Sequence, residues 1–146
     1  MKRLLVPVVA LLALTGPSVL GAAGGGITVT DARVRMVPPN TTMAQMSLVV
    51  HNQSTRDRKL VGAHSPLATA VELHARLTEA ADDLRMREIP DIAIAAHGEV
   101  ALTPRGLHLM LIGLKQPLSE GEIVPVILTF DGGGTVRVDA VVGSDR

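Results

Sequence analysis

The chain has 146 residues, which is enough for one ordinary domain. Lysine and arginine number 14, aspartate and glutamate also number 14, and the formal net charge is zero. A neutral chain without a basic block lacks the phosphate-neutralising charge of a nucleic-acid-binding protein. The sequence has no cysteine, and Phe130 is its one aromatic residue. This composition excludes disulfides, thiolate nucleophiles and cysteine-ligated metal sites, and it leaves almost no aromatic surface for stacking bases or sugars.

The first 23 residues have the pattern of a secretory signal peptide. A basic start at Lys2 and Arg3 precedes an apolar stretch at 4–14 and small residues at 21–23. We expect 1–23 to be removed on export and 24–146 to form the mature domain outside the cytoplasm. The apolar stretch is short for a permanent membrane span. No cysteine lies near the expected cut, so we expect no lipid anchor there.

After residue 26, short β-rich segments alternate with turn residues, without a convincing helical period. The predicted strands, in chain order, are Ile27–Arg35, Met43–His51, Leu60–His64, Ala70–His74, Leu84–Ile89, Glu99–Thr103, Leu107–Ile112, Ile123–Phe130 and Thr135–Val142. The last two flank Asp131–Gly134, whose glycines can adopt positive φ in a hairpin. This pattern predicts one all-β domain, either a sandwich or a Greek-key barrel. A short helix within Ala68–Leu84 is a weaker alternative for that segment.

Histidine and methionine are the remaining soft or borderline metal ligands, because cysteine is absent. Residues i and i+2 of an extended strand share a face. His108 and Met110 should therefore project together, and the residues pointing the opposite way are Leu107, Leu109 and Leu111. His74 should share a face with Glu72 for the same reason. We expect four side chains from three segments to converge at one edge of the domain: His74, Met86, His108 and Met110.

Two imidazole nitrogens and two thioether sulfurs form a selective ligand set. Thioether suits copper(I) and is a poor donor to zinc, magnesium or calcium. An electron-transfer copper site ordinarily adds a cysteine thiolate to two histidines, and this chain has none. We find no HExxH motif, no Ser–His–Asp arrangement and no phosphate-binding glycine loop. The sequence therefore predicts a copper(I)-binding protein that is not an enzyme.

The spacing of these residues resembles the motif of the periplasmic PCuAC copper chaperones, H-(M)-x10-M-x21-H-x-M. His74 is followed by Ala75 and ten residues, then by Met86, twenty-one residues, His108, Leu109 and Met110. The flanking segments VELH and HLMLIGLKQPLSEGEIVPVILTF are also similar to the family, and the resemblance covers 27–142. Ala75 departs from the family, which often has methionine there. The C-terminal GSDR lacks the His/Met-rich tail of some relatives, so we expect no second, copper(II), binding mode.

The resemblance implies a cupredoxin-like β-barrel that binds one copper(I) ion at an exposed site, with the ligands His74, Met86, His108 and Met110. It also implies a periplasmic protein that donates copper toward cytochrome c oxidase assembly. The acceptor would be the copper-bearing subunit of that oxidase or another copper assembly chaperone. We expect a monomer without a membrane span in its mature form. Two alternatives stay open, namely a periplasmic copper buffer or tolerance protein without a dedicated acceptor, and a structural β-sandwich with no metal.

The other histidines and methionines have simpler interpretations. Three methionines are predicted to be core residues: Met36, Met43 and Met46. The offset of three between the last two places them on opposite strand faces, so that one of them can lie at the rim of the site. Three histidines beside loop residues are predicted to be solvated, with an accessory ligand role open for the first two: His51, His64 and His97. The arginines that flank Met86, Arg85 and Arg87, are predicted to face solvent, and Asp82–Asp83 is predicted to be a turn.

Overall fold

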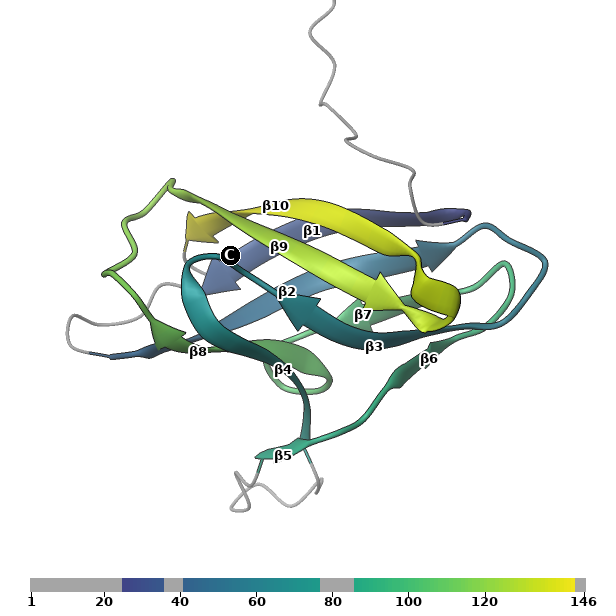
Figure 1. The fold of residues 1–146 in the computed structure, drawn as a ribbon, viewed down its shortest axis with the longest axis horizontal. Helices are drawn as coiled ribbons and strands as arrows, with labels where there is room; N and C mark the ends of the chain where they lie inside the picture. The colour runs from purple at the N-terminus through teal and green to yellow at the C-terminus, as the bar shows by residue number, and fades with distance from the viewer. Residues whose placement is uncertain (1–24, 36–40, 77–85, 144–146) are drawn as a thin grey trace, which may run out of the picture.

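The computed structural model describes residues 25–35, 41–76 and 86–143 (Figure 1). These segments form ten strands and one short 3-10 turn. The first five strands are β1 (Ile27–Arg35), β2 (Met43–Asn52), β3 (Arg58–His64), β4 (Ala68–Arg76) and β5 (Met86–Glu88). The others are β6 (Ile92–Ile94), β7 (Glu99–Leu102), β8 (His108–Leu114), β9 (Ile123–Phe130) and β10 (Thr135–Gly143), with the turn η1 (Asp131–Gly133) before the last. No helix in these segments is long and apolar enough to cross a membrane.

Seven of the described strands close into a barrel, in the order β4-β8-β2-β1-β10-β9-β3. The circle is completed where β3 pairs with β4 at Ala63 and Val71. β1 and β10 run parallel, whereas the other neighbours in the barrel are antiparallel. The short strands β5, β6 and β7 pair with β4, β3 and β2, respectively. This architecture confirms the predicted all-β barrel.

Alternating side chains fill the interior of this barrel. Every second residue of β2 is at most 2% exposed, namely the apolar Ala44, Met46, Leu48 and Val50 and, at the end of the strand, Asn52. The residues between them face outward, because successive side chains of a strand point to opposite faces. Phe130, at the end of β9, is 1% exposed and is the largest fully buried side chain in the described segments. The inner face is thus mostly apolar.

The turn between β9 and β10 is held by charged residues of β3. Gly132 and Gly133 have φ values of 77° and 85°, as predicted for a glycine-rich hairpin. The Asp131 carboxylate accepts hydrogen bonds from Nε of Arg58 at 3.1 Å and from the backbone N–H of Lys59 at 3.0 Å. The bond from the Lys59 backbone, followed by the one from Arg58, lowers the pKa of Asp131. The hairpin is therefore joined to β3 by a charge-assisted contact.

Three predictions about the strands are corrected by the structure. The helical alternative is wrong over Ala68–Arg76, because this segment is β4 and pairs on both sides. Of the predicted strand Leu84–Ile89, the structure describes residues from Met86 onward, and the strand ends at Glu88 rather than at Ile89. The strand Ile92–Ile94 was not predicted, because its three residues are too few to establish an alternating pattern. The remainder of the helical alternative falls in 77–85, which lies outside the described residues.

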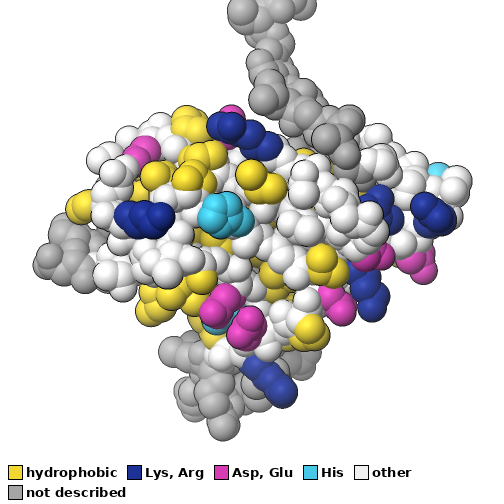
Figure 2. All heavy atoms as spheres, in the orientation of Figure 1, with side chains coloured by type: hydrophobic (Ala, Val, Ile, Leu, Met, Phe, Trp, Pro, Cys, Tyr) yellow, Lys and Arg dark blue, Asp and Glu magenta, His cyan; other side chains and the backbone are white. Residues whose placement is uncertain are grey.

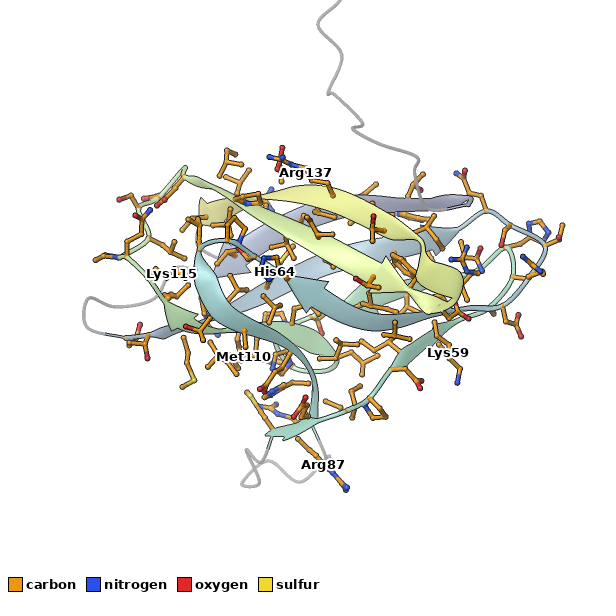
Figure 3. The ribbon with its side chains drawn as sticks, viewed as in Figure 1. Lys59, His64, Arg87, Met110, Lys115 and Arg137 are labelled. Carbon is orange, nitrogen blue, oxygen red and sulfur yellow. The ribbon has the colours of Figure 1, made fainter. Side chains whose placement is uncertain are left out.

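The methionine predictions are correct for one residue and wrong for another. Met46 is fully buried, as predicted, but Met43 is 52% exposed. The two residues do lie on opposite faces of β2, and Met43 is on the outer one. The remaining predictions for Met36, Asp82–Asp83 and Arg85 concern residues outside the described segments. Arg87 is exposed on β5, as predicted, and Figure 3 labels it pointing away from the barrel.

Candidate metal centre

His74 of β4 and His108 of β8 are direct partners in the pairing of these two strands. In the neighbouring pair, Glu72 lies opposite Met110, and Gln45 of β2 lies opposite Met110 on its other side. The residues that alternate with them on β4 and β8 point to the opposite side, into the core, and are at most 4% exposed: Leu73, Leu109 and Leu111. His108 and Met110 therefore share the outer face, as the alternation predicts. Figure 3 labels Met110 where β4 and β8 approach β5.

The two imidazole rings are close enough to share one metal ion. Their centroids are 5.7 Å apart, and the ring planes are inclined at 52°. A zinc ion lies about 2.0–2.1 Å from a ligating ring nitrogen, and other first-row ions are comparable, which places the ion about 3 Å from the ring centre. Two rings that share an ion therefore have centres at most about 6 Å apart. The observed separation falls within this limit.

Each ring has one nitrogen with a partner and one without. Nε2 of His74 is 2.8 Å from Oε2 of Glu72, and Nδ1 of His108 donates to the carbonyl of Gly106 at 3.1 Å. Nδ1 of His74 and Nε2 of His108 are buried and have no hydrogen-bond partner. Buried polar atoms are normally paired, and a metal-bound histidine typically uses its second nitrogen for a carboxylate or backbone carbonyl. These two ring nitrogens are therefore the atoms at which a metal ion could bind.

The surroundings of His108 lower its pKa and favour the neutral ring. Burial is the largest effect and lowers the pKa of His108, although its hydrogen bond to Gly106 raises it in part. The charges of His74 and Arg76 lower this pKa further. Because Nδ1 carries the proton that Gly106 accepts, the neutral ring has its lone pair on Nε2. In the neutral ring, that lone pair is available to a metal ion.

Met86 approaches the histidines from the edge of the sheet. It lies on β5, which is separated from β2 by β4 and β8 in the strand order. Nevertheless, its sulfur is 3.7 Å from Nε2 of Gln45 on β2. The side chains of Met86 and Gln45 therefore meet over the outer face of β4 and β8, where Met110 and the two imidazoles lie. All four predicted ligands are thus gathered in one region of the surface.

The centre is less open than the predicted exposed site. His108 is fully buried, and the side chain of His74 is 14% exposed. Met86 is 36% exposed, so the thioether edge is the more open one. Figure 2 shows acidic side chains beside a histidine in the region where β4 approaches β5. The carboxylate of Glu72 lies against His74 on this side.

The remaining histidines lie elsewhere. His64 and His97 are exposed, as predicted, and Figure 3 labels His64 at the end of β3. His51 is half-buried and is not freely solvated, because its ring contacts Thr30 at 2.9 Å and Glu99 at 3.0 Å. It lies six residues along β2 from Gln45, a distance of roughly 20 Å in an extended strand. An accessory ligand role for His51 is therefore not supported.

Gln45 is the residue of this region that the sequence analysis missed. Its contact with Met86 joins two segments that are 41 residues apart in the chain. The strand alternation places Gln45 on the outer face, but that signal is shared by every second residue of β2. Glu72 had a clearer signal, because it lies two residues before His74 and shares its face. Within the described segments, no group of three or more His, Cys, Asp or Glu residues is arranged to hold a metal ion.

Comparison with known proteins identifies the family. A family profile described as "Putative lipoprotein LpqE-like" matches residues 27–142. The chain belongs to the LpqE-like family. This LpqE-like protein is 32% identical over 136 residues to "Putative lipoprotein Lxx21020" of Leifsonia xyli subsp. xyli (strain CTCB07). The match covers 88% of this chain and 81% of that protein.

Two solved structures resemble the LpqE-like chain across most of its length. The copper-bound PCuAC domain from PmoF2 has a TM-score of 0.71 and 25% identity, over 85% of this chain and 97% of that one. Copper(I)-bound DR1885 from Deinococcus radiodurans has a TM-score of 0.64 and 34% identity, over 90% of this chain and 84% of that one. These similarities confirm the PCuAC-type, cupredoxin-like barrel. The assignment of four ligands by the motif stays a prediction.

Proposed function

We propose that this protein is an exported, non-enzymatic carrier of copper(I). The ligands are Nδ1 of His74, Nε2 of His108 and the sulfurs of Met86 and Met110. The observation that carries the proposal is the pair of buried ring nitrogens without partners beside two thioether side chains. The similarity to copper-bound PCuAC domains supports the same metal.

The ligand chemistry favours copper(I) over the commoner divalent ions. Thioether sulfur is a soft, neutral ligand, whereas calcium and magnesium take oxygen ligands and zinc takes nitrogen, thiolate or carboxylate. Four neutral ligands leave the site with the single positive charge of the ion. The carboxylate of Glu72, which contacts His74, partly balances that charge across the imidazole. Copper(I) is therefore the ion that this set accommodates best.

The shape of the centre suits transfer of copper to another protein. His74 and His108 are held on paired strands of the barrel, whereas Met86 lies on a short edge strand and is the most exposed of the four ligands. An incoming ligand from an acceptor can replace the sulfur of Met86 first, while both imidazoles still hold the ion. Copper then moves by stepwise ligand exchange and is never released as a free ion. We propose the copper-bearing subunit of cytochrome c oxidase, or another copper assembly chaperone, as the acceptor.

The proposed location is the periplasm. We propose that residues 24–146 form the mature domain and that the protein is a monomer. The signal-like pattern of 1–23 and the description of the relatives as lipoproteins both support export. Fractionation of cells and N-terminal sequencing of the secreted chain test this proposal. A cytoplasmic protein that retains Met1 and the basic start would contradict it.

Copper(I) binding is tested by competition with a chromophoric copper(I) chelator under anaerobic conditions. We expect one equivalent to bind, and we expect the Met86→Leu, Met110→Leu double variant to lose tight binding. Met43→Leu is the matched control, because Met43 is an exposed thioether of the neighbouring strand outside the ligand set. Protein concentration must come from amino-acid analysis, since the chain has no Trp or Tyr. Equal binding by the double variant and the control would refute the ligand assignment.

A transfer assay separates a chaperone from a copper buffer. The copper(I)-loaded protein is mixed with the apo copper-bearing domain of the oxidase subunit, and the copper content of each is followed with time. For a chaperone, we expect the rate of copper transfer to the acceptor domain to exceed the rate of copper loss to a small chelator at the same concentration. Equal rates would favour the buffer.

A further inference from the structure

The position of the Met86 thioether requires an explanation, because its own strand is poorly anchored. β5 has three residues, all exposed, and pairs only with β4 among the described strands. Methionine has three rotatable side-chain bonds, so an exposed thioether ordinarily samples many positions. Here the sulfur of Met86 is within 3.7 Å of the Gln45 amide. This contact places the sulfur over the outer face of β4 and β8.

Gln45 is well placed to act as an anchor. Its neighbours on β2, Ala44 and Met46, are at most 2% exposed and are packed in the core. Its backbone pairs with Met110 of β8, and from Met46 onward β2 also pairs with β1. The amide of Gln45 therefore projects from a strand in the barrel wall, next to one predicted ligand and in contact with another.

We propose that Gln45 is a positioning residue that holds Met86 in place for copper(I). This inference rests on the proposed function. It adds that Gln45 determines how well the sulfur of Met86 is positioned to bind copper(I). The amide N–H donates to the sulfur, which is a weak acceptor, and the remaining sulfur lone pair is free for copper. The ordering of Met86 occurs when the protein folds, so less conformational entropy is lost when copper binds.

The contact also affects how copper leaves the protein. Met86 is the most exposed predicted ligand, so its sulfur is the first that an acceptor can replace. A thioether that stays near the copper ion through Gln45 rebinds readily after it dissociates. Loss of the amide donor should therefore accelerate copper release more than it changes the number of ions bound.

The test uses two variants with different chemistry at one position. Gln45→Glu keeps the length of the side chain but, once ionised, has no N–H to donate. Gln45→Leu keeps a similar volume without any polar group. Gln116→Ala is the matched control, because Gln116 donates to Glu122 in the segment before β9 and has no contact with Met86. Thermal unfolding checks that all variants are folded. Two different substitutions are made at Gln45 so that the test can still be carried out if one of them prevents folding.

The first measurement needs no copper. Methionine methyl groups are labelled with carbon-13 in the apo protein, and the signal of Met86 is assigned with Met86→Leu. We expect this signal to move toward the position and narrow linewidth of a freely rotating methionine in both Gln45 variants but not in Gln116→Ala. An unchanged Met86 signal in both Gln45 variants would overturn the positioning role.

The second measurement is the rate of copper(I) release to a chelator in excess. We expect release to be roughly three- to tenfold faster in both Gln45 variants, which corresponds to the loss of one neutral hydrogen bond. The stoichiometry should stay at one equivalent. Release rates equal to that of the unmodified protein would overturn the role of Gln45 in copper handling. Failure of the unmodified protein to bind copper would instead refute the proposed function, while the methyl spectra would still report the contact.

Discussion

His74 and His108 are backbone partners across β4 and β8, with ring centroids 5.7 Å apart. Each ring is oriented by a different kind of partner, a carboxylate for His74 and a backbone carbonyl for His108. Because each partner occupies one nitrogen, the other nitrogen of each ring is left for a ligand. The two strands of the barrel thus hold a pair of oriented imidazoles before any metal binds, which lowers the cost of forming the site.

Glu72 should contribute to copper affinity without touching the metal. Its carboxylate is 2.8 Å from Nε2 of His74, so it orients the ring and fixes the tautomer that leaves Nδ1 for a metal ion. We expect Glu72→Ala to weaken copper(I) binding about 10- to 100-fold in a chelator competition. Glu88→Ala is the control, because Glu88 is exposed and is the backbone partner of His74 on β5. Equal affinities for the two variants would contradict this role of Glu72.

His108 should be a ligand that costs stability in the absence of metal. Its Nε2 is buried without a partner, and an unsatisfied buried polar atom costs about 1–3 kcal/mol. His108→Leu removes this atom but also removes the hydrogen bond to Gly106. We therefore expect the free energy of unfolding of the apo protein to change by less than about 1 kcal/mol, while tight copper(I) binding is lost.

Leu109→Ala is the comparison for His108→Leu in urea denaturation. Leu109 is fully buried in the core, and such a truncation lowers the free energy of unfolding by about 2–5 kcal/mol. A loss of that size in His108→Leu would mean that His108 is a core residue in its own right. The burial of His108 would then reflect packing in the core and would not support a role as a metal ligand.

Asp131 should make the stability of the barrel depend on pH in the acidic range. Hydrogen bonds from Lys59 and Arg58 lower its pKa below the ordinary value of 3.8. The ionised carboxylate therefore stabilises the fold above that value, and the stabilisation is lost as the pH falls through the lowered pKa of the folded state. Asp131→Asn should be less stable than the unmodified protein in urea at pH 7, and the difference should shrink as the pH falls below the ordinary value of 3.8.

The control for Asp131 is an exposed ion pair on β10. Asp139 pairs with Arg137 at 3.2 Å, and both side chains are well exposed. Such pairs contribute little to stability, so Asp139→Asn should change the urea midpoint only slightly at either pH. If Asp131→Asn and Asp139→Asn behave alike at pH 7, the contact with β3 does not stabilise the hairpin.

Much of the centre could be predicted from the sequence because strand alternation is a local property. The shared face of His108 and Met110 follows from their offset of two residues. The direct pairing of His74 with His108 does not, because the register of β4 on β8 depends on how the whole barrel closes. The contact between Gln45 and Met86 depends on the same closure and has no local signal.

Burial was the harder property to predict. An offset of three places Met43 and Met46 on opposite faces, but it does not say which of them faces the core. The structure buries Met46 and exposes Met43 because Met46 shares the inner face with Ala44, Leu48 and Val50. The burial of His108, on the outer face, arises from neighbours that no local pattern in the sequence indicates.

The central claim is that two histidines and two methionines bind one copper(I) ion. X-ray absorption spectroscopy of the copper(I)-loaded protein tests it most directly, because nitrogen and sulfur neighbours scatter differently. We predict two nitrogen and two sulfur neighbours for the unmodified protein, and no sulfur neighbour after Met86→Leu and Met110→Leu are combined. A copper ion without sulfur neighbours, or a sulfur signal that persists in the double variant, would contradict the account.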